Sequence, residues 1–251
     1  MSRRAGIVAS IGCLAVVTAC APATGAVPIA ERSAAPATPS PAPAPRWTAA
    51  GALFDGTPDA LGNHFCSGSV IDTPGQDTVL TAAHCVATGD GTPARTGMEF
   101  VPGYADGRAP FGVWTVTAAA VAPAWLAHGD PSVDVAVLTV HRADGVPVER
   151  LTGGFRLTVD PGSVNAVEAI GYPDDSDAPL VRAGTTTRFS PTQLELDAPG
   201  LYDGTSGGPW VCDGDEVVGV TGGYEQGGLT PDVSYASYLD AATTALLPPP
   251  G

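Results

Sequence analysis

Apolar residues occur in short runs from Trp47 to about Leu247, and Gly, Pro, Asp and Asn separate one run from the next. Short apolar runs bounded by turn-forming residues predict β-strands. The 32 Gly and 25 Pro argue against long helices, so this part of the chain is expected to form a β-sandwich or a β-barrel. The clearest runs cover residues 65–71, 79–81, 135–140 and 217–220.

Two local patterns refine this expectation. The pair Asp213-Gly214 lies between two apolar runs in residues 210–218 and predicts a tight turn, and therefore a β-hairpin. Only residues 238–247 have a helical pattern, and Pro248 would end that helix. The sequence thus predicts an all-β domain with a short C-terminal helix.

The first 19 residues have the features of an export signal. Arg3 and Arg4 precede an apolar stretch over residues 5–17, which is too short to span a bilayer and is followed by small residues. We therefore expect residues 1–19 to be a signal peptide and the protein to be exported.

Residues 17–20, with the sequence Val-Thr-Ala-Cys, resemble the lipobox of bacterial lipoproteins. In those proteins the cysteine thiol is lipidated and the cysteine becomes the first residue. The resemblance implies a lipid anchor at Cys20, which would hold the protein at the extracellular face of the cell membrane. The alternative is ordinary signal cleavage with Cys20 incidental, which would leave the protein fully secreted.

Residues 20–46 contain mainly Ala and Pro after Cys20 and show no apolar periodicity, which indicates a linker. Proline-rich chains extend by about 3.1 Å per residue, so this linker could hold a domain up to roughly 80 Å from its anchor. A pro-peptide and a passive spacer are the alternatives. The folded domain is expected over residues 47–251.

Charge excludes one class of partner. The formal net charge is −15, all 11 basic residues are Arg, and the sequence has no basic cluster beyond Arg3 and Arg4. Proteins that bind nucleic acids need a basic surface to contact phosphates, so we expect no nucleic-acid partner. The acidity is interpreted as a surface feature that favours solubility.

Three short motifs supply the groups needed for nucleophilic catalysis. Residues 80–85 (Leu-Thr-Ala-Ala-His-Cys) contain His84, residues 134–138 begin with Asp134, and residues 204–209 (Gly-Thr-Ser-Gly-Gly-Pro) contain Ser206. A serine hydroxyl becomes a good nucleophile when an imidazole accepts its proton, and a buried carboxylate fixes the tautomer of that imidazole. Asp130 lies four residues before Asp134, but the apolar run that follows Asp134 favours Asp134 as this carboxylate.

The chain order His, Asp, Ser differs from the orders found in α/β-hydrolases and in subtilisins. With His-Phe-Cys-Ser-Gly-Ser at 64–69 and Thr-Ala-Ala-His-Cys at 81–85, the sequence resembles the trypsin/chymotrypsin family, and especially its small secreted bacterial branch. The resemblance covers residues 47–247. It implies two packed six-stranded antiparallel β-barrels and a serine endopeptidase that works through an acyl-enzyme intermediate.

The resemblance also assigns roles to residues. His84, Asp134 and Ser206 match the catalytic triad, and the backbone N–H groups of Gly204 and Ser206 match the oxyanion hole. Cys66 and Cys85 match a disulfide beside the catalytic histidine. With Cys20 lipidated and Cys13 removed with the signal peptide, Cys212 would have no partner, so we expect a free, buried thiol there, with intermolecular pairing as the alternative.

The resemblance to the family is weakest around the specificity pocket. The resemblance places Gly200 at the pocket floor, and Gly200 supplies no carboxylate that would select Lys or Arg. Residues Thr221, Gly222 and Gly223 match the edge that pairs with the substrate backbone. Asp232 could reach the pocket from a later strand or lie in an exposed turn.

Animal members of the family carry Asp immediately before the nucleophile, whereas this chain has Thr205. We therefore expect no dependence on the new N-terminal amine that activates those zymogens.

The expected partners are protein or peptide substrates, and the protein is expected to be a monomer. No cofactor or metal is expected, because His64, His128 and His141 have no paired ligands at metal-binding spacing. Two alternatives use the same fold. The domain could be an esterase, or it could be a catalytically silent surface binding module, although the intact triad argues against the second.

Overall fold

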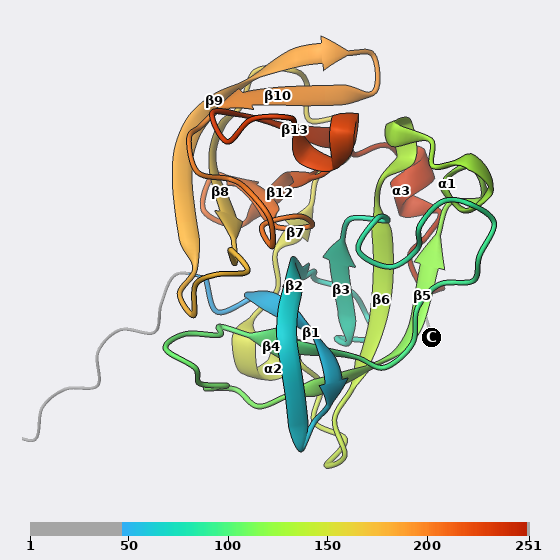
Figure 1. Cartoon of the computed structure of the whole chain (residues 1–251), viewed down its shortest axis with the longest axis vertical. Coiled ribbons are helices and arrows are strands. Elements are labelled where there is room, and N and C mark those ends of the chain that lie inside the picture. The colour runs from blue at the N-terminus through green and yellow to red at the C-terminus, as the bar shows by residue number, and fades with distance from the viewer. Residues whose placement is uncertain (1–46, 250–251) are drawn as a thin grey trace, which may run out of the picture. The chain divides into compact units, whose positions relative to one another are not determined.

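The computed structural model describes residues 47–249 of the chain (Figure 1). The predictions for the signal peptide, Cys20 and the linker concern residues 1–46 and lie outside this range. None of the helices within residues 47–249 has the length and apolar character needed to cross a membrane.

The first half of the described chain forms a closed six-stranded antiparallel barrel. Its strands follow the order β1-β2-β3-β6-β5-β4, and β4 pairs with β1 to close the ring. In Figure 1 these strands run from blue to green. The strands are β1 (Ala50–Thr57), β2 (Ala60–Val70), β3 (Thr78–Thr81), β4 (Met98–Pro102), β5 (Trp114–Val121) and β6 (Ala136–His141).

The second half forms another ring of six antiparallel strands. The order is β11-β8-β9-β10-β13-β12, and the pairing of β11 with β12 closes it. A short seventh strand, β7, pairs in parallel with β12 outside the ring. The strands are β7 (Arg156–Leu157), β8 (Ala166–Gly171), β9 (Leu180–Ser190), β10 (Gln193–Asp197), β11 (Pro209–Cys212), β12 (Glu216–Thr221) and β13 (Val233–Tyr238).

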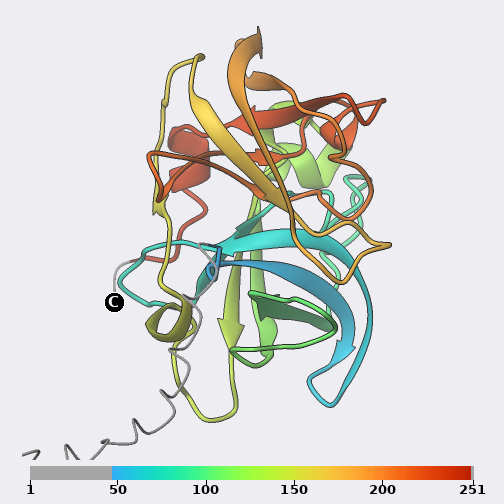
Figure 2. The same cartoon turned by 90° about the vertical axis from the view of Figure 1, so that its left-hand side faces the viewer.

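The predicted fold of two packed six-stranded barrels is confirmed, with β7 as an addition. Figure 2 shows the two barrels one above the other. The predicted hairpin is β11–β12, and Asp213 and Gly214 in its turn have positive φ angles of 49° and 89°. Asp and Gly tolerate this left-handed backbone better than most residues, which explains why they form the turn.

The predicted short C-terminal helix is confirmed as α3, but its predicted bounds, residues 238–247, and the expectation of a single helix are wrong. Helix α3 covers only Ala241–Thr244, because Tyr238 still pairs with Gly219 in the sheet. Asp240 then caps the helix by accepting hydrogen bonds from the N–H groups of Ala242 and Thr243. The structure also contains α1 (Pro123–His128), α2 (Glu149–Thr152) and two 3₁₀ helices, η1 (Pro131–Val133) and η2 (Tyr224–Gly227). Helices this short have too few turns to show a helical period in the sequence.

Each barrel has an apolar interior. Leu53, Phe100 and Trp114 belong to the large cluster that fills the first barrel and extends to its contact with the second. Leu194 and Trp210 belong to a smaller cluster within the second barrel. These residues are fully buried, so the two barrels form rigid supports for the loops between them.

The first barrel also contains a buried carboxyl group, whose ionisation should affect the stability of the fold. Glu99 on β4 is 2% exposed, and its Oε2 atom has no hydrogen-bond partner. Burial raises the pKa of Glu99, although a hydrogen bond with Thr115 opposes this shift. Because folding raises this pKa, Glu99 contributes most to the stability of the fold at low pH. That contribution is lost as pH rises through the pKa of the folded state.

We therefore expect Glu99→Gln to raise the melting temperature at about pH 8, because it removes a buried charge, and to change it little at about pH 4, where Glu99 is protonated. Thermal unfolding of the wild type and the variant at both pH values measures this. An equal shift at both pH values would mean that packing, and not ionisation, determines the effect.

Candidate active site

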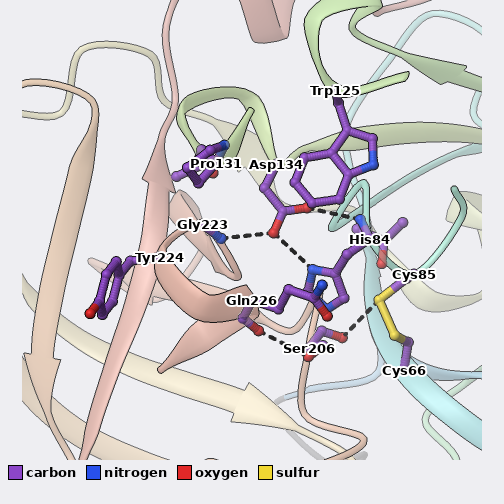
Figure 3. Close-up of polar contacts among 12 residues, drawn as sticks. Cys66, His84, Cys85, Trp125, Pro131, Asp134, Ser206, Gly223, Tyr224 and Gln226 are labelled. Carbon is purple, nitrogen blue, oxygen red and sulfur yellow. Dashed lines mark hydrogen bonds and ion pairs between the residues drawn. A yellow bond between two sulfur atoms is a disulfide. The ribbon is translucent and has the colours of Figure 1, made fainter. Parts of the chain in front are cut away.

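Three loops bring His84, Asp134 and Ser206 together, and Figure 3 shows the His84 ring between the other two side chains. His84 lies in a turn directly after β3, and Asp134 follows η1 just before β6. Ser206 lies in the turn that precedes β11 of the second barrel. The first barrel thus supplies the imidazole and the carboxylate, and the second supplies the hydroxyl.

Asp134 is completely buried and accepts three hydrogen bonds. Its Oδ1 atom accepts from the His84 backbone N–H at 2.9 Å. Its Oδ2 atom contacts His84 Nδ1 at 2.8 Å and accepts from the Gly223 N–H at 2.8 Å. Because an ionised carboxylate can only accept hydrogen bonds, Nδ1 carries the proton and Nε2 is left as the basic nitrogen.

Asp130, the other acidic residue considered for this role, has a local function. Its side chain accepts a hydrogen bond from the Ser132 N–H at 2.9 Å and thereby caps η1. Within residues 47–249, no hydrogen bond joins Asp130 to His84.

Ser206 is partly exposed, and its Oγ atom lies 3.5 Å from the carbonyl oxygen of Gln226. No hydrogen bond joins its hydroxyl to the His84 ring among the residues that the structure describes. In unliganded active sites such bonds are often long and tighten only when substrate is bound.

The segment that carries Gln226 has an uncommon backbone. Glu225 and Gln226 adopt φ angles of 48° and 56°, a left-handed conformation that disfavours most side chains. Such residues often occur at functional sites, where the surrounding structure maintains the strain. Here the conformation places the Gln226 carbonyl next to the Ser206 hydroxyl (Figure 3).

Glycines allow the Ser206 loop to pack against its neighbours. Gly204 and Gly207 have φ angles of 88° and 78°. A Cβ atom on Gly204 would lie 2.3 Å from the backbone nitrogen of Asp174, and one on Gly207 would lie 2.1 Å from Thr81 Oγ1. Both positions therefore exclude larger residues for two reasons, the backbone conformation and the lack of space.

A pocket of about 170 Å³ opens beside Ser206. Its walls contain two exposed carboxylates, those of Asp203 and Glu225, and the buried Thr221. The remaining lining residues are Leu201, Tyr202, Thr205, Ser206, Gln226, Gly227 and Gly228.

Of the residues assigned to substrate binding, Thr221 is the one that lines this pocket. The Gly200 N–H donates to the Pro231 carbonyl, and Gly200 is not among the lining residues. Asp232 is exposed, its carbonyl accepts from the Ala198 N–H, and it too lies outside the lining.

Gly222 and Gly223 lie against Asp134. A Cβ atom on Gly222 would be 2.9 Å from Asp134 Oδ2, and the Gly223 N–H donates to that same oxygen. The N–H groups of Thr221 and Gly222 are also used, because they donate to the carbonyls of Gly208 and Tyr235. The carbonyls of Thr221 and Gly223 are used as well, because they accept from the N–H groups of Gly207 and Gln226.

The sequence patterns did not indicate the pocket residues Leu201 and Asp203 or the segment 225–228. A signal for the second was available, since residues 222–228 contain four glycines in a loop between two predicted strands. Glycine-rich loops near a catalytic residue often allow a close approach of a ligand to the backbone.

The disulfide between Cys66 and Cys85 is confirmed. It joins β2 to the turn that contains His84, and closing a loop with a sequence separation of 19 typically stabilises a protein by about 3 kcal/mol. Cys212 has a free thiol, as expected, but it is partly exposed and not buried. Partial burial and the nearby carboxylates of Glu216 and Asp213 raise the pKa of this thiol.

The other histidines lie away from this site or take part in packing. His64 is buried with its ring against Phe54 and Tyr104, and burial lowers its pKa although Asp177 and Asp174 act in the opposite direction. His128 ends α1, and His141 ends β6.

Two groups of side chains in the described chain have atoms close enough to share a metal ion. The first contains His84 with Cys66 and Cys85, whose sulfur atoms are joined in the disulfide. The second contains Cys212, Asp213 and Glu216 at the β11–β12 hairpin, where Glu216 already pairs with Arg156.

The fold is shared with solved protease structures. Protease Anisep from Arthrobacter nicotinovorans has a TM-score of 0.69 and 23% identity, with coverage of 80% of this chain and 94% of that chain. Thermostable serine protease AL20 from an extremophilic microorganism has a TM-score of 0.70 and 24% identity, covering 80% and 96%. A Glu endopeptidase has a TM-score of 0.65 and 19% identity, covering 80% and 88%.

A comparison with curated protein sequences gave no significant match. Residues 66–220, more than half of the chain, match the family model described as the trypsin-like peptidase domain. This match includes His84, Asp134 and Ser206 and confirms the family that the motifs predicted. The chain therefore belongs to the trypsin-like peptidase family.

Proposed function

We propose that the protein is a serine endopeptidase that hydrolyses peptide bonds through an acyl-enzyme intermediate on Ser206. The observation that supports this most strongly is the buried Asp134–His84 pair next to a partly exposed serine hydroxyl (Figure 3). In the neutral imidazole the contact with Asp134 places the proton on Nδ1, so Nε2 has the lone pair that a general base requires.

In the proposed reaction, the Ser206 hydroxyl turns from the Gln226 carbonyl toward His84 when substrate binds. His84 Nε2 takes the hydroxyl proton while Oγ attacks the peptide carbonyl, and His84 then gives this proton to the leaving amine. Asp134 holds the imidazole and stabilises its charged form. A water molecule, activated by His84 in the same way, hydrolyses the ester on Ser206.

The backbone N–H groups of Gly204 and Ser206 are proposed to bind the oxyanion of the tetrahedral intermediate. This role is supported by the backbone of the loop, because the described residues use neither N–H group in a hydrogen bond within the protein. Loss of one such donor typically lowers kcat by about 10²- to 10³-fold.

Gly204→Ala provides a test of this part of the proposal. The added methyl group would collide with the Asp174 nitrogen and the Tyr172 carbonyl, at 2.3 and 2.5 Å, so the loop must shift. We expect kcat to fall by at least about 10²-fold with a smaller change in KM. Gly214→Ala is the control, because Gly214 also has positive φ but no neighbour within 4 Å. Equal activities of the two variants would contradict the assignment.

The experiment that tests the proposed function compares peptide and ester hydrolysis. Wild type and Ser206→Ala are incubated with a mixed peptide library and with a simple aryl ester, and new N-termini are identified by mass spectrometry. An endopeptidase produces internal cleavages that Ser206→Ala lacks. Ester cleavage alone would indicate an esterase, and no cleavage of either substrate by the folded wild type would favour a silent binding module.

For the location of the protein, we propose export followed by attachment through a lipid on Cys20. The Cys66–Cys85 disulfide is typical of proteins outside the reducing cytosol. Fractionation of cells that produce wild type or Cys20→Ala tests the anchor. Wild type is expected with the membranes and the variant in the medium, whereas the same distribution for both would indicate ordinary secretion.

A further inference from the structure

Strand β2 of the first barrel contacts the loop that carries Ser206. The backbone N–H of Ser67 donates to the Ser206 carbonyl oxygen at 2.7 Å. The Ser67 hydroxyl donates to the Gly204 carbonyl oxygen at 2.9 Å, and the residue is only 1% exposed. Ser67 thus holds the carbonyl groups of the same two residues whose N–H groups are proposed to bind the oxyanion.

The direction of the hydroxyl proton follows from the partners of Ser67. The Tyr172 N–H donates to Ser67 Oγ at 2.8 Å. A serine hydroxyl has one proton to give, an N–H can only donate, and a carbonyl can only accept. The proton must therefore lie on the side of Gly204, and the hydroxyl joins two backbone groups of the second barrel.

Ser67 is itself fixed within the first barrel. Its carbonyl oxygen accepts a hydrogen bond from Thr81 Oγ1 at 2.7 Å, and both residues are buried. Thr81 ends β3, three residues before His84. The same short path of hydrogen bonds therefore connects the strand before the proposed base with the loop of the proposed oxyanion hole.

Gly204 needs such a restraint, because glycine has access to more backbone conformations than other residues. The peptide group before Gly204 is held by a bond from the Asp174 N–H to the Asp203 carbonyl at 3.0 Å. In the peptide group after it, Ser67 holds the carbonyl and the Thr205 N–H donates to the Tyr202 carbonyl. Removing the Ser67 hydroxyl would release the Gly204 carbonyl. It would also leave two buried backbone groups, this carbonyl and the Tyr172 N–H, without their partner.

We propose that Ser67 is a positioning residue for the oxyanion hole, because from the opposite barrel it holds the peptide group that follows Gly204 and thereby limits the backbone conformations of Gly204. This inference rests on the proposed function. It predicts that Ser67 acts on the transition state through Gly204 and has little effect on the binding of the substrate ground state.

The test compares Ser67→Ala with Ser69→Ala in the purified protein. Ser69 is a matched control, because it lies two residues along β2, is fully buried, and its Oγ atom has no hydrogen-bond partner. For Ser67→Ala we expect kcat to fall by roughly 10- to 100-fold, since a displacement of about 1 Å in an active site can lower the rate 100-fold. KM should change by less than about threefold, and Ser69→Ala should keep the kcat of the wild type.

A second measurement separates positioning from general damage. A peptide boronate forms a tetrahedral adduct on an active serine, so its affinity should fall in parallel with kcat in Ser67→Ala, while both variants keep a cooperative unfolding transition. If Ser67→Ala does not fold, Ser67→Gly takes its place, because it leaves room for a water molecule that satisfies both backbone groups without tying them to β2.

Equal kcat values for the folded Ser67 and Ser69 variants, or a loss confined to KM, would overturn the positioning role. An inactive wild type would instead overturn the proposed function, and this inference with it. The activity of the wild type therefore distinguishes the two failures.

Discussion

Ser206→Ala is expected to lower kcat for peptide hydrolysis by about 10⁶-fold, the loss typical when the nucleophile of a serine protease is removed. The fold should be unaffected. The hydroxyl is partly exposed and makes one long contact, 3.5 Å to the Gln226 carbonyl, so its removal should change the free energy of unfolding by less than about 0.5 kcal/mol.

Initial rates with a peptide substrate and thermal unfolding measure these two effects. Ser234→Ala is a suitable control from the second barrel, because the Ser234 hydroxyl is buried and has no hydrogen-bond partner. Activity within tenfold of the wild type in Ser206→Ala would show that another group attacks the substrate.

The second large effect is expected for Asp134→Asn. All three hydrogen bonds to Asp134 come from donors, two on Oδ2 and one on Oδ1. Whichever way the Asn side chain is turned, its NH₂ group faces a backbone N–H, either that of Gly223 or that of His84. With the NH₂ group at the Oδ2 position, where it also faces His84 Nδ1, the substitution favours the wrong tautomer of His84, and kcat should fall by about 10⁴-fold.

Asp130→Asn is the matched control for this substitution. Asp130 has the same side chain four residues earlier, but its carboxylate caps η1, a role that Asn can also fill. We expect wild-type kcat for Asp130→Asn and a lower melting temperature for Asp134→Asn, because three buried donors are affected. Similar losses of kcat in both variants would mean that the whole 130–134 segment, and not the contact with His84, determines activity.

The fold and the contact between Asp134 and His84 could be predicted because their signals are local in the sequence. The strands of both barrels are short apolar runs between turn residues, and this pattern depends on neighbours along the chain. His84, Asp134 and Ser206 each lie in a distinctive short motif next to such a strand. The order of these motifs along the chain, His, Asp and then Ser, indicated the family. The family resemblance in turn predicted the contact between Asp134 and His84 that the structure shows.

The pocket could not be predicted in the same way, because its walls depend on contacts between distant segments. Glu225 and Gln226 reach the pocket through positive φ angles, which sequence patterns do not indicate for these residue types. Asp203 lines the pocket directly before Gly204, whereas Asp232 is held at the surface next to Ala198. The position of Ser67 between two barrels is also a tertiary feature, since its partners lie more than 100 residues away.

The most direct test of the account is whether His84 activates Ser206 in the folded protein. The purified protein is treated with a fluorophosphonate probe, which labels activated serines, and the modified peptide is identified by mass spectrometry in wild type, Ser206→Ala and His84→Ala. The account predicts a label on Ser206 in the wild type and none in either variant. Label on another residue, or no label on a wild type with intact unfolding behaviour, would contradict it.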